Sequence, residues 1–298
     1  MKKWLVLVLS FLIFYGCAKA PVTGRTQIMM VSPQQEKAMG FQTERAILKK
    51  ERLSRDRALI ERVNRVGMRI ARATGKKLDW KFFVIDKPDV PNAFCLANGH
   101  VFVYTGIMKY VSNDAQLATV IAHEIGHAIA HHVAEQVSMA MVTNLATTAA
   151  AVAIQHNVHS SSEASAYMMA LGLGANLGIV LPYSRMMESE ADHIGLMIMA
   201  RACYDPRQAI AFWEKFAKQG KEPPVYFSTH PSSKQRIAQL QKLMPEALKI
   251  YHEHHCDQQP VYHPPLRQSR PAYGDEEDYR VPTRRVAPTY NRLIGPGY

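Results

Sequence analysis

At its N-terminus the chain lacks a hydrophobic run long enough to cross a bilayer. The apolar run there, Trp4 to Tyr15, has about a dozen residues, whereas a membrane-spanning helix needs about 20. Two lysines precede the run and Gly16-Cys17 follows it, which predicts a secretory signal peptide at residues 1–16. Gly16-Cys17 looks like the end of a lipobox, so we expect Cys17 to carry lipid. Simple cleavage and an uncleaved anchor are the alternatives.

Cysteine is also scarce, with four residues among 298. If Cys17 is acylated, Cys95, Cys203 and Cys256 remain. Three is an odd number, so at most one disulfide forms within the chain. A Cys203–Cys256 bond would join the end of one predicted helix to a C-terminal helix, but spacing alone does not fix the connectivity.

Acidic residues are few in the first part of the chain. The net charge is +11, and residues 1–80 hold 17 Lys and Arg against 6 Asp and Glu. The excess lies in two predicted helices, 33–50 and 54–74, and Ser32-Pro33 marks the start of the first. A basic face after a lipid anchor can lie against anionic headgroups, or it can be an ordinary solvated face. Nucleic-acid motifs are absent, so we predict no nucleic-acid partner.

The strongest chemical signal is the motif His123-Glu-Ile-Gly-His127. Two imidazoles four residues apart share one helix face, beside a carboxylate, and this arrangement holds a catalytic zinc ion and a general base together. The surrounding stretch 117–132 lacks proline and is apolar on most sides, which predicts a buried helix that Asn113 and Gln116 can cap. The alternative is a pair of core histidines bonded to backbone carbonyls.

A third zinc ligand is expected in the segment Glu188-Ser-Glu-Ala-Asp192. Glu188 and Asp192 are four residues apart and share a helix face, so the first can bind zinc while the second accepts the N–H of a ligand histidine. Glu190 lies roughly 160–200° around that helix, and we expect it to have little direct effect on the metal site. A solvated acidic helix face is the alternative.

Three other histidines, His131, His132 and His230, could lie near a metal site. A third histidine of the type found ten residues after the first would fall at Val133, so that arrangement is excluded. His131 and His132 extend the predicted helix, and we expect His131 to lie near the site or at the surface. His230 precedes a proline in a predicted loop, where it could donate a hydrogen bond to an oxyanion or be purely structural.

A wider set of motifs occurs in a fixed order along the chain. It comprises Ala20–Gly24, Asn92–Phe94, Val103–Gly106, His123–His127, Glu188–Asp192, Tyr204–Pro206 and Ser228–Pro231. This set resembles the HtpX/Ste24-type (CAAX-prenyl-protease-like) gluzincin metallopeptidases over about residues 20–250. It is most similar to their periplasmic lipoprotein members, such as LoiP and the peptidase domain of BepA.

The resemblance implies a mainly helical α+β gluzincin fold, with a small β-sheet or hairpin at the edge of the cleft, in a peptidase domain at residues 17–256. It implies one zinc ion per chain and Glu124 as the catalytic base. The implied ligands are His123, His127 and Glu188. It also implies that Asp192 lies behind a ligand, and that His230 stabilises the oxyanion or fills the open metal position, with Arg236 close by.

In function, the resemblance implies a zinc endopeptidase of the bacterial envelope that cuts unfolded or misassembled proteins. Ala18 after Cys17 resembles the sorting signal for lipid anchoring at the outer membrane. The alternative is a non-proteolytic chaperone or assembly factor that holds clients in the same groove. The substrate, the cleavage preference and the oligomeric state are not predicted.

Residues 80–106 carry the β signal. Trp80 to Ile85 predicts a strand, and two further strands flank Asn98-Gly99, a pair that favours a type I′ hairpin. An edge strand can bind extended substrate through its backbone. By resemblance and geometry we expect the substrate-binding edge strand at His100, Val101, Phe102, Val103 and Tyr104, with a purely structural hairpin as the alternative.

Two remaining stretches have less defined roles. Residues 138–181 are rich in Ala, Met and Gly, and we expect either core packing or a mobile helical flap, but no membrane-spanning helix. Residues 257–298 are rich in Pro and Arg with few core formers, and they predict a disordered tail or an extended segment that lies on the surface.

Overall fold

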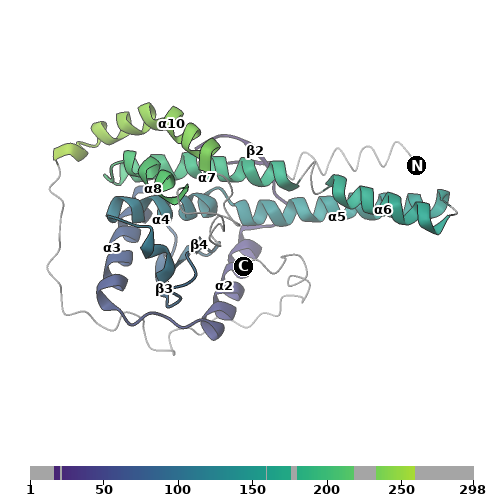
Figure 1. Ribbon diagram of the computed structural model, residues 1–298, viewed down its shortest axis with the longest axis horizontal. Helices are drawn as coiled ribbons and strands as arrows, with labels where there is room; N and C mark the ends of the chain where they lie inside the picture. Colours follow the sequence, from purple (N-terminus) through teal and green to yellow (C-terminus); the bar gives the residue numbers. More distant parts are fainter. Residues whose placement is uncertain (1–16, 21, 159, 176–179, 218–232, 259–298) are drawn as a thin grey trace.

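The computed structural model describes residues 17–20, 22–158, 160–175, 180–217 and 233–258 (Figure 1). His230, the predicted signal peptide and almost all of the predicted tail lie outside these residues. The helices are α2 (Pro33–Lys50), α3 (Arg57–Ala73), α4 (Asp114–Ile129), α5 (His132–Asn157), α6 (Ser161–Ala175), α7 (Leu181–Arg201), α8 (Arg207–Ala217) and α10 (Ser233–Glu253). The strands are β1 (Cys17–Lys19), β2 (Thr26–Ile28), β3 (Lys81–Ile85), β4 (Ala93–Cys95) and β5 (His100–Tyr104), and two short 3₁₀ turns lie at Thr105–Lys109 and Cys256–Gln258. The predicted α+β, mainly helical fold is confirmed.

Side-chain caps fix where the helices begin. Ser32 and Gln35 form the reciprocal capping box predicted for α2. Asp56 accepts a hydrogen bond from the backbone N–H of Leu59 at the start of α3. Asn113 does the same for Gln116 in α4, the helix that carries the metal-binding motif.

The three-stranded sheet has the order β3-β5-β4, which corrects the expected edge strand. β5 pairs in parallel with β3 and antiparallel with β4, so both of its backbone edges are used. His100–Tyr104 therefore lies at the centre of the sheet and cannot accept a substrate strand. The side chain of His100 is buried and bonds Glu44 at 2.8 Å, which gives it a structural role. Within the described residues, β4 is the edge strand that packs against α4.

The predicted hairpin between β4 and β5 is present, but its turn is not type I′. A type I′ turn needs positive φ at both central residues, and only Gly99 of the Asn98-Gly99 pair has one, at 90°. The backbone of Gly99 bonds Leu96, and Leu96 bonds His100, which closes a three-residue loop. Asn98 instead turns its side chain to Glu44, a buried partner that the sequence pattern did not reveal.

Helices cover both faces of the sheet. One face, with Phe82, Val84 and Val101, packs into the main core formed with α3, α4, α7, α8 and α10. The opposite face, with Phe83 and Phe102, packs against the C-terminal half of α2. In Figure 1, α4 lies inside this assembly with α7 alongside it. The metal-binding motif is thus held on the most buried helix of the core.

The helix predicted at 117–132 is interrupted. α4 ends at Ile129, and His131 adopts the left-handed conformation with φ of 57° before α5 begins at His132. Beyond this break, α5 and α6 form a hairpin that extends away from the rest of the protein (Figure 1). Large apolar side chains on it are exposed, so the expectation that this stretch packs into the core is wrong. α5 is also long and apolar enough to cross a membrane, with 11% of its most apolar window buried, in contrast to the prediction.

Cys203 and Cys256 form a disulfide, with their Cα atoms 5.0 Å apart. It joins the end of α7 to the turn after α10, and is the pairing that the sequence left open. Cys95 is a buried free thiol in β4.

Candidate active site

The site depends on a close crossing of α4 and α7. A Cβ added at Gly126 would lie 2.8 Å from the backbone oxygen of Ala191, and one at Gly195 would lie 3.0 Å from the backbone of Ala122. Such distances leave no room for a side chain, so glycine at both positions lets the two backbones touch. The crossing brings the two motif histidines of α4 beside the acidic segment of α7.

Three side chains meet at this crossing in the arrangement of a metal site. The Nε2 atoms of His123 and His127 are 3.1 Å apart. Glu188 places Oε2 at 3.3 Å from His123 Nε2 and Oε1 at 3.3 Å from His127 Nε2. Zinc bonds of about 2.0–2.2 Å in tetrahedral geometry put neighbouring ligand atoms about 3.3 Å apart. The donor set and its spacing therefore fit a zinc ion.

Asp192 lies behind one of these ligands. Its Oδ1 is 3.0 Å from His123 Nδ1, so an N–H at Nδ1 leaves the Nε2 lone pair of His123 for a metal. Asp192 also accepts a hydrogen bond from Arg236 Nε at 2.5 Å. The other end of that guanidinium is 3.1 Å from Glu188 and stacks at 3.9 Å on the ring of Trp213. Arg236 thus holds both carboxylates of α7 in place.

Burial and charge give the two motif histidines opposite pKa shifts. Burial lowers the pKa of His127 to about 3, so its imidazole is neutral and available to a metal. Burial and Arg236 also lower the pKa of His123, but hydrogen bonds to Asp192 and Glu188 outweigh them and raise it to about 9. Without a metal the carboxylates hold a proton on His123, which a zinc ion must displace.

Glu124 is buried on α4 between the two histidines. Its charge contributes, after burial, to the raised pKa of the Cys95 thiol in β4. α4, which carries Glu124 and both histidines, packs against β4, an edge strand of the sheet. A general base must lie within hydrogen-bond reach of the water molecule that attacks a bound peptide.

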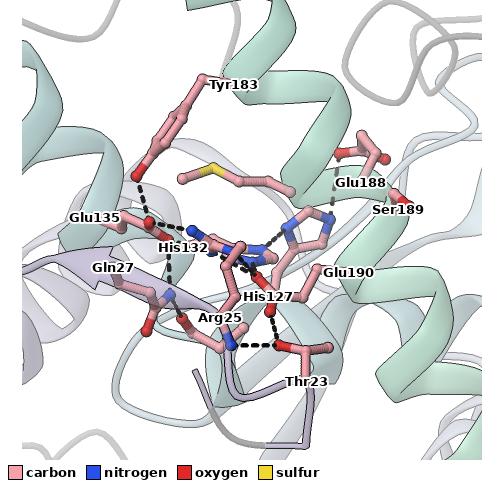
Figure 2. A network of polar contacts seen from close by, with 12 residues as sticks. Thr23, Arg25, Gln27, His127, His132, Glu135, Tyr183, Glu188, Ser189 and Glu190 are labelled. Atoms are coloured by element: carbon pink, nitrogen blue, oxygen red, sulfur yellow. Dashed lines mark hydrogen bonds and ion pairs between the residues drawn. The ribbon is translucent and has the colours of Figure 1, made fainter. Parts of the chain in front are cut away.

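Behind His127 lies a second group of polar residues that the sequence reasoning missed (Figure 2). His127 Nδ1 is 2.8 Å from His132 Nδ1, and His132 Nε2 is 3.1 Å from Glu190 Oε2. Arg25, from the segment before β2, bonds Glu190 and also Glu135 of α5. Glu190 does not face the metal, as helix geometry predicts, but it is connected to a ligand through His132. In the sequence, the adjacent pair His131-His132 just after the motif was the feature that could have indicated this group.

The fold and the site together define a metallopeptidase of the H-E-x-x-H type, in which Glu188 lies where a third ligand would be. The comparison with known families agrees, since residues 54–244 match peptidase family M48. This match covers more than half of the chain, and the chain belongs to that family. Members of family M48 are zinc-dependent, and the chain is a metalloendopeptidase.

Curated relatives carry the same activity in their names. The chain is 32% identical to the mitochondrial metalloendopeptidase OMA1 of Saccharomyces cerevisiae, over 85% of this chain and 78% of that protein. It is 32% identical to the zebrafish OMA1 over 87% of this chain and 57% of that protein. It is 28% identical to the β-barrel assembly-enhancing protease of Escherichia coli, over 73% of this chain and 45% of that protein.

The expected membership of the HtpX/Ste24-type family, which is family M48, is confirmed. The expected closeness to LoiP and BepA is not. The OMA1 relatives have higher identities than the Escherichia coli protease, so the special closeness to the periplasmic lipoprotein branch stays a prediction. The chain spans about half the length of most of these relatives.

Proposed function

We propose that the protein is a zinc-dependent endopeptidase that cuts unfolded or misassembled proteins in the bacterial cell envelope. The observation that carries the catalytic part is the donor set of His123, His127 and Glu188, with separations that fit zinc, beside the buried Glu124. The breadth of substrates rests on the edge strand, because backbone pairing depends little on side chains.

His123, His127 and Glu188 would hold a zinc ion, which would supply Lewis acidity to the scissile carbonyl and to the attacking water. Glu124 takes a proton from that water and passes it to the leaving amine. Asp192 holds His123 in the tautomer that a metal requires, and Arg236 keeps Asp192 and Glu188 in position. His230 remains a candidate for stabilising the oxyanion, on the resemblance alone.

The extended substrate pairs with β4 in this proposal. β4 is short, lies at the edge of the sheet and packs against α4, the helix that carries Glu124 and both motif histidines. A peptide that adds to it runs past the metal ligands, and its backbone supplies the hydrogen bonds. This places substrate on the opposite side of β4 from β5.

The envelope location is supported by two features. Cys17 follows a short apolar run and looks like a lipidation site, and a disulfide such as Cys203–Cys256 persists in oxidising compartments. The name of the Escherichia coli relative also refers to assembly of β-barrels. We expect mass spectrometry of the mature N-terminus to find lipid on Cys17. An unmodified Ala18 or a retained Met1 would contradict the anchor.

The test of the activity is hydrolysis of casein by the zinc-loaded protein, with and without a chelator. We expect cleavage that stops when zinc is removed and returns when it is restored. Suppression of casein aggregation without any cleavage would favour the alternative, a chaperone or assembly factor.

A further inference from the structure

We propose that His132, Glu190 and Arg25 form a relay that positions the zinc ligand His127, and that the N-terminal segment is therefore part of the active site. This inference rests on the proposed metal site and extends it. The residues involved come from three separate parts of the chain, namely the segment before β2, the start of α5 and the middle of α7 (Figure 2).

Hydrogen-bond chemistry fixes the direction of the relay. His132 Nε2 faces the carboxylate of Glu190 at 3.1 Å, so this nitrogen carries the proton and donates. A neutral His132 then has a lone pair at Nδ1, which lies 2.8 Å from His127 Nδ1. His127 must donate from Nδ1, and its Nε2 is left with the lone pair that faces His123 and Glu188. This is the tautomer that a metal ligand needs.

Each metal-binding histidine thus has its own carboxylate. Asp192 accepts a hydrogen bond from Nδ1–H of His123 directly. His132 accepts one from Nδ1–H of His127 and in turn donates to Glu190, so Glu190 acts through one intervening imidazole. His132 can reach this position because the chain turns at His131 and starts a new helix. A continuous helix would carry His132 away from His127, five residues before it.

Arg25 holds the far end of the relay. Its guanidinium makes two parallel bonds to Glu135, at 2.6 and 2.7 Å, and bonds Glu190 Oε2 at 2.6 and 2.9 Å. Glu135 is fully buried and Glu190 is 5% exposed, so the two carboxylates need this positive charge. His132, Glu135 and Glu190 lie close enough to hold a metal ion, but the guanidinium already supplies the cation there.

Further hydrogen bonds hold the N-terminal segment, residues 23–30, against the region where α4 ends and α5 begins. Gln27 is buried and donates to the backbone oxygen of Ala130 and to Glu135, both at 2.6 Å. Thr23 donates to Glu190, and the backbone N–H of Met30 donates to Ser138 of α5 at 2.8 Å. These contacts lie before residue 54, where the match to the peptidase family begins. The segment therefore completes a site whose metal ligands all lie in the matched region.

The test compares zinc affinity of the full-length chain and its variants by competition with a chromophoric chelator. His132→Phe and Glu190→Gln are expected to weaken zinc binding about 10- to 100-fold, as loss of an outer partner does. Arg25→Lys keeps the positive charge but loses the paired guanidinium hydrogen bonds to Glu135. It should weaken zinc binding less than Arg25→Met, which also removes the charge. Arg52→Gln removes an exposed arginine that pairs with Asp86 and takes no part in the relay, and it serves as the matched control.

A second readout separates the relay from a general structural role. In zinc-loaded protein labelled with ¹⁵N-histidine, NMR should find the proton of His127 on Nδ1 and that of His132 on Nε2. Circular dichroism of the metal-free variants establishes that each is folded. Tight zinc binding by folded His132→Phe and Glu190→Gln, or a His132 proton on Nδ1, would overturn the relay. Failure of the wild-type protein to bind zinc would instead overturn the proposed metal site.

A different observation carries a second proposal, concerning the α5–α6 hairpin. Between Gln136 and Ser184 the only Asp, Glu, Lys or Arg is Glu163, which lies near the tip of the hairpin. Leu145 is 74% exposed and Met169 is 70% exposed, so the apolar surface is not covered by the body of the protein. α5 carries Asn144, Thr147 and Thr148 but no charged residue after Glu135, and a long, mostly apolar helix that is exposed to water suits a lipid environment.

We infer that the α5–α6 hairpin inserts into the hydrocarbon core of a lipid bilayer. Ser138 is the last buried residue of α5, and the 19 residues that follow it in the helix extend about 28 Å, close to the thickness of a hydrocarbon core of about 30 Å. The base of α5 carries His132 and Glu135, so insertion fixes the active site close to the membrane surface. The polar tip, with Asn157, Ser162 and Glu163, would then reach the headgroups on the far side.

The test uses the full chain with Cys17→Ala, so that no lipid anchor contributes. An environment-sensitive fluorophore is attached at Leu145→Cys, and a control fluorophore at Asp89→Cys, a 95% exposed side chain on the body. Phosphatidylcholine vesicles are used because they carry no net charge to attract a basic protein. We expect a blue shift and quenching by brominated acyl chains at residue 145 only. A water-exposed probe at 145, or its burial in a protein dimer without vesicles, would overturn the proposal.

Discussion

Gly126→Ala is the substitution that tests the helix crossing most sharply. The added Cβ would lie 2.8 Å from the backbone oxygen and 3.3 Å from the Cα of Ala191. Ordinary contacts need about 3.5 Å, so the two helices must separate by about 0.7 Å. Backbone atoms cannot rotate away, and overpacking of this kind costs about 1–3 kcal/mol. The same displacement pulls Glu188 away from His127.

We therefore expect Gly126→Ala to lower the free energy of unfolding of the metal-free protein by about 1–3 kcal/mol and to weaken zinc binding. Urea denaturation and a zinc titration measure the two effects. Gly172→Ala is the matched control, because its Cβ would meet nothing within 4 Å in α6. It should leave zinc binding unchanged and raise stability by roughly 0.5–1 kcal/mol. Wild-type stability and zinc affinity in Gly126→Ala would refute the reasoning.

Two further predictions concern the ligands and the pH. Glu188→Ala should lose zinc affinity sharply, whereas Asp192→Ala should lose about 10- to 100-fold, and a zinc titration of both checks the order. Burial raises the pKa of Asp114 but its hydrogen bonds to two α3 arginines outweigh burial and lower it below 3.8. A lowered pKa stabilises the fold above the ordinary value, and this stabilisation is lost as the pH falls through the folded value. Asp114→Asn should cost about 0.5–1 kcal/mol at neutral pH, with a smaller difference in acid, measured by urea denaturation.

Much of the site could be predicted because it depends on short-range periodicity. The spacing of His123 and His127 and of Glu188 and Asp192 fixes which side chains share a helix face, and the structure brings these faces together. Helix starts at Ser32 and Asn113 followed from local capping chemistry in the same way. The relative placement of two helices this far apart in sequence came from the resemblance and not from spacing.

The remaining features depend on tertiary contacts that periodicity does not encode. The order of strands in a sheet is set by how the strands pair, so His100–Tyr104 could not be distinguished from an edge strand by its sequence. The break at His131 is held by a hydrogen bond to Glu36 and by Gln27, both distant in sequence. The sequence predicts a continuous helix through His132, and such a helix would not bring His132 next to His127. The role of Arg25 depends on the same long-range contacts.

The central claim is that Glu124 acts as the base of a zinc peptidase without binding the metal. Glu124→Gln tests it most directly, with zinc content measured by elemental analysis and cleavage of unfolded casein measured on the same sample. The account predicts one zinc per chain, an intact fold and almost no proteolysis, because the base is lost while the ligands remain. Cleavage of casein by the variant at the wild-type rate would contradict it.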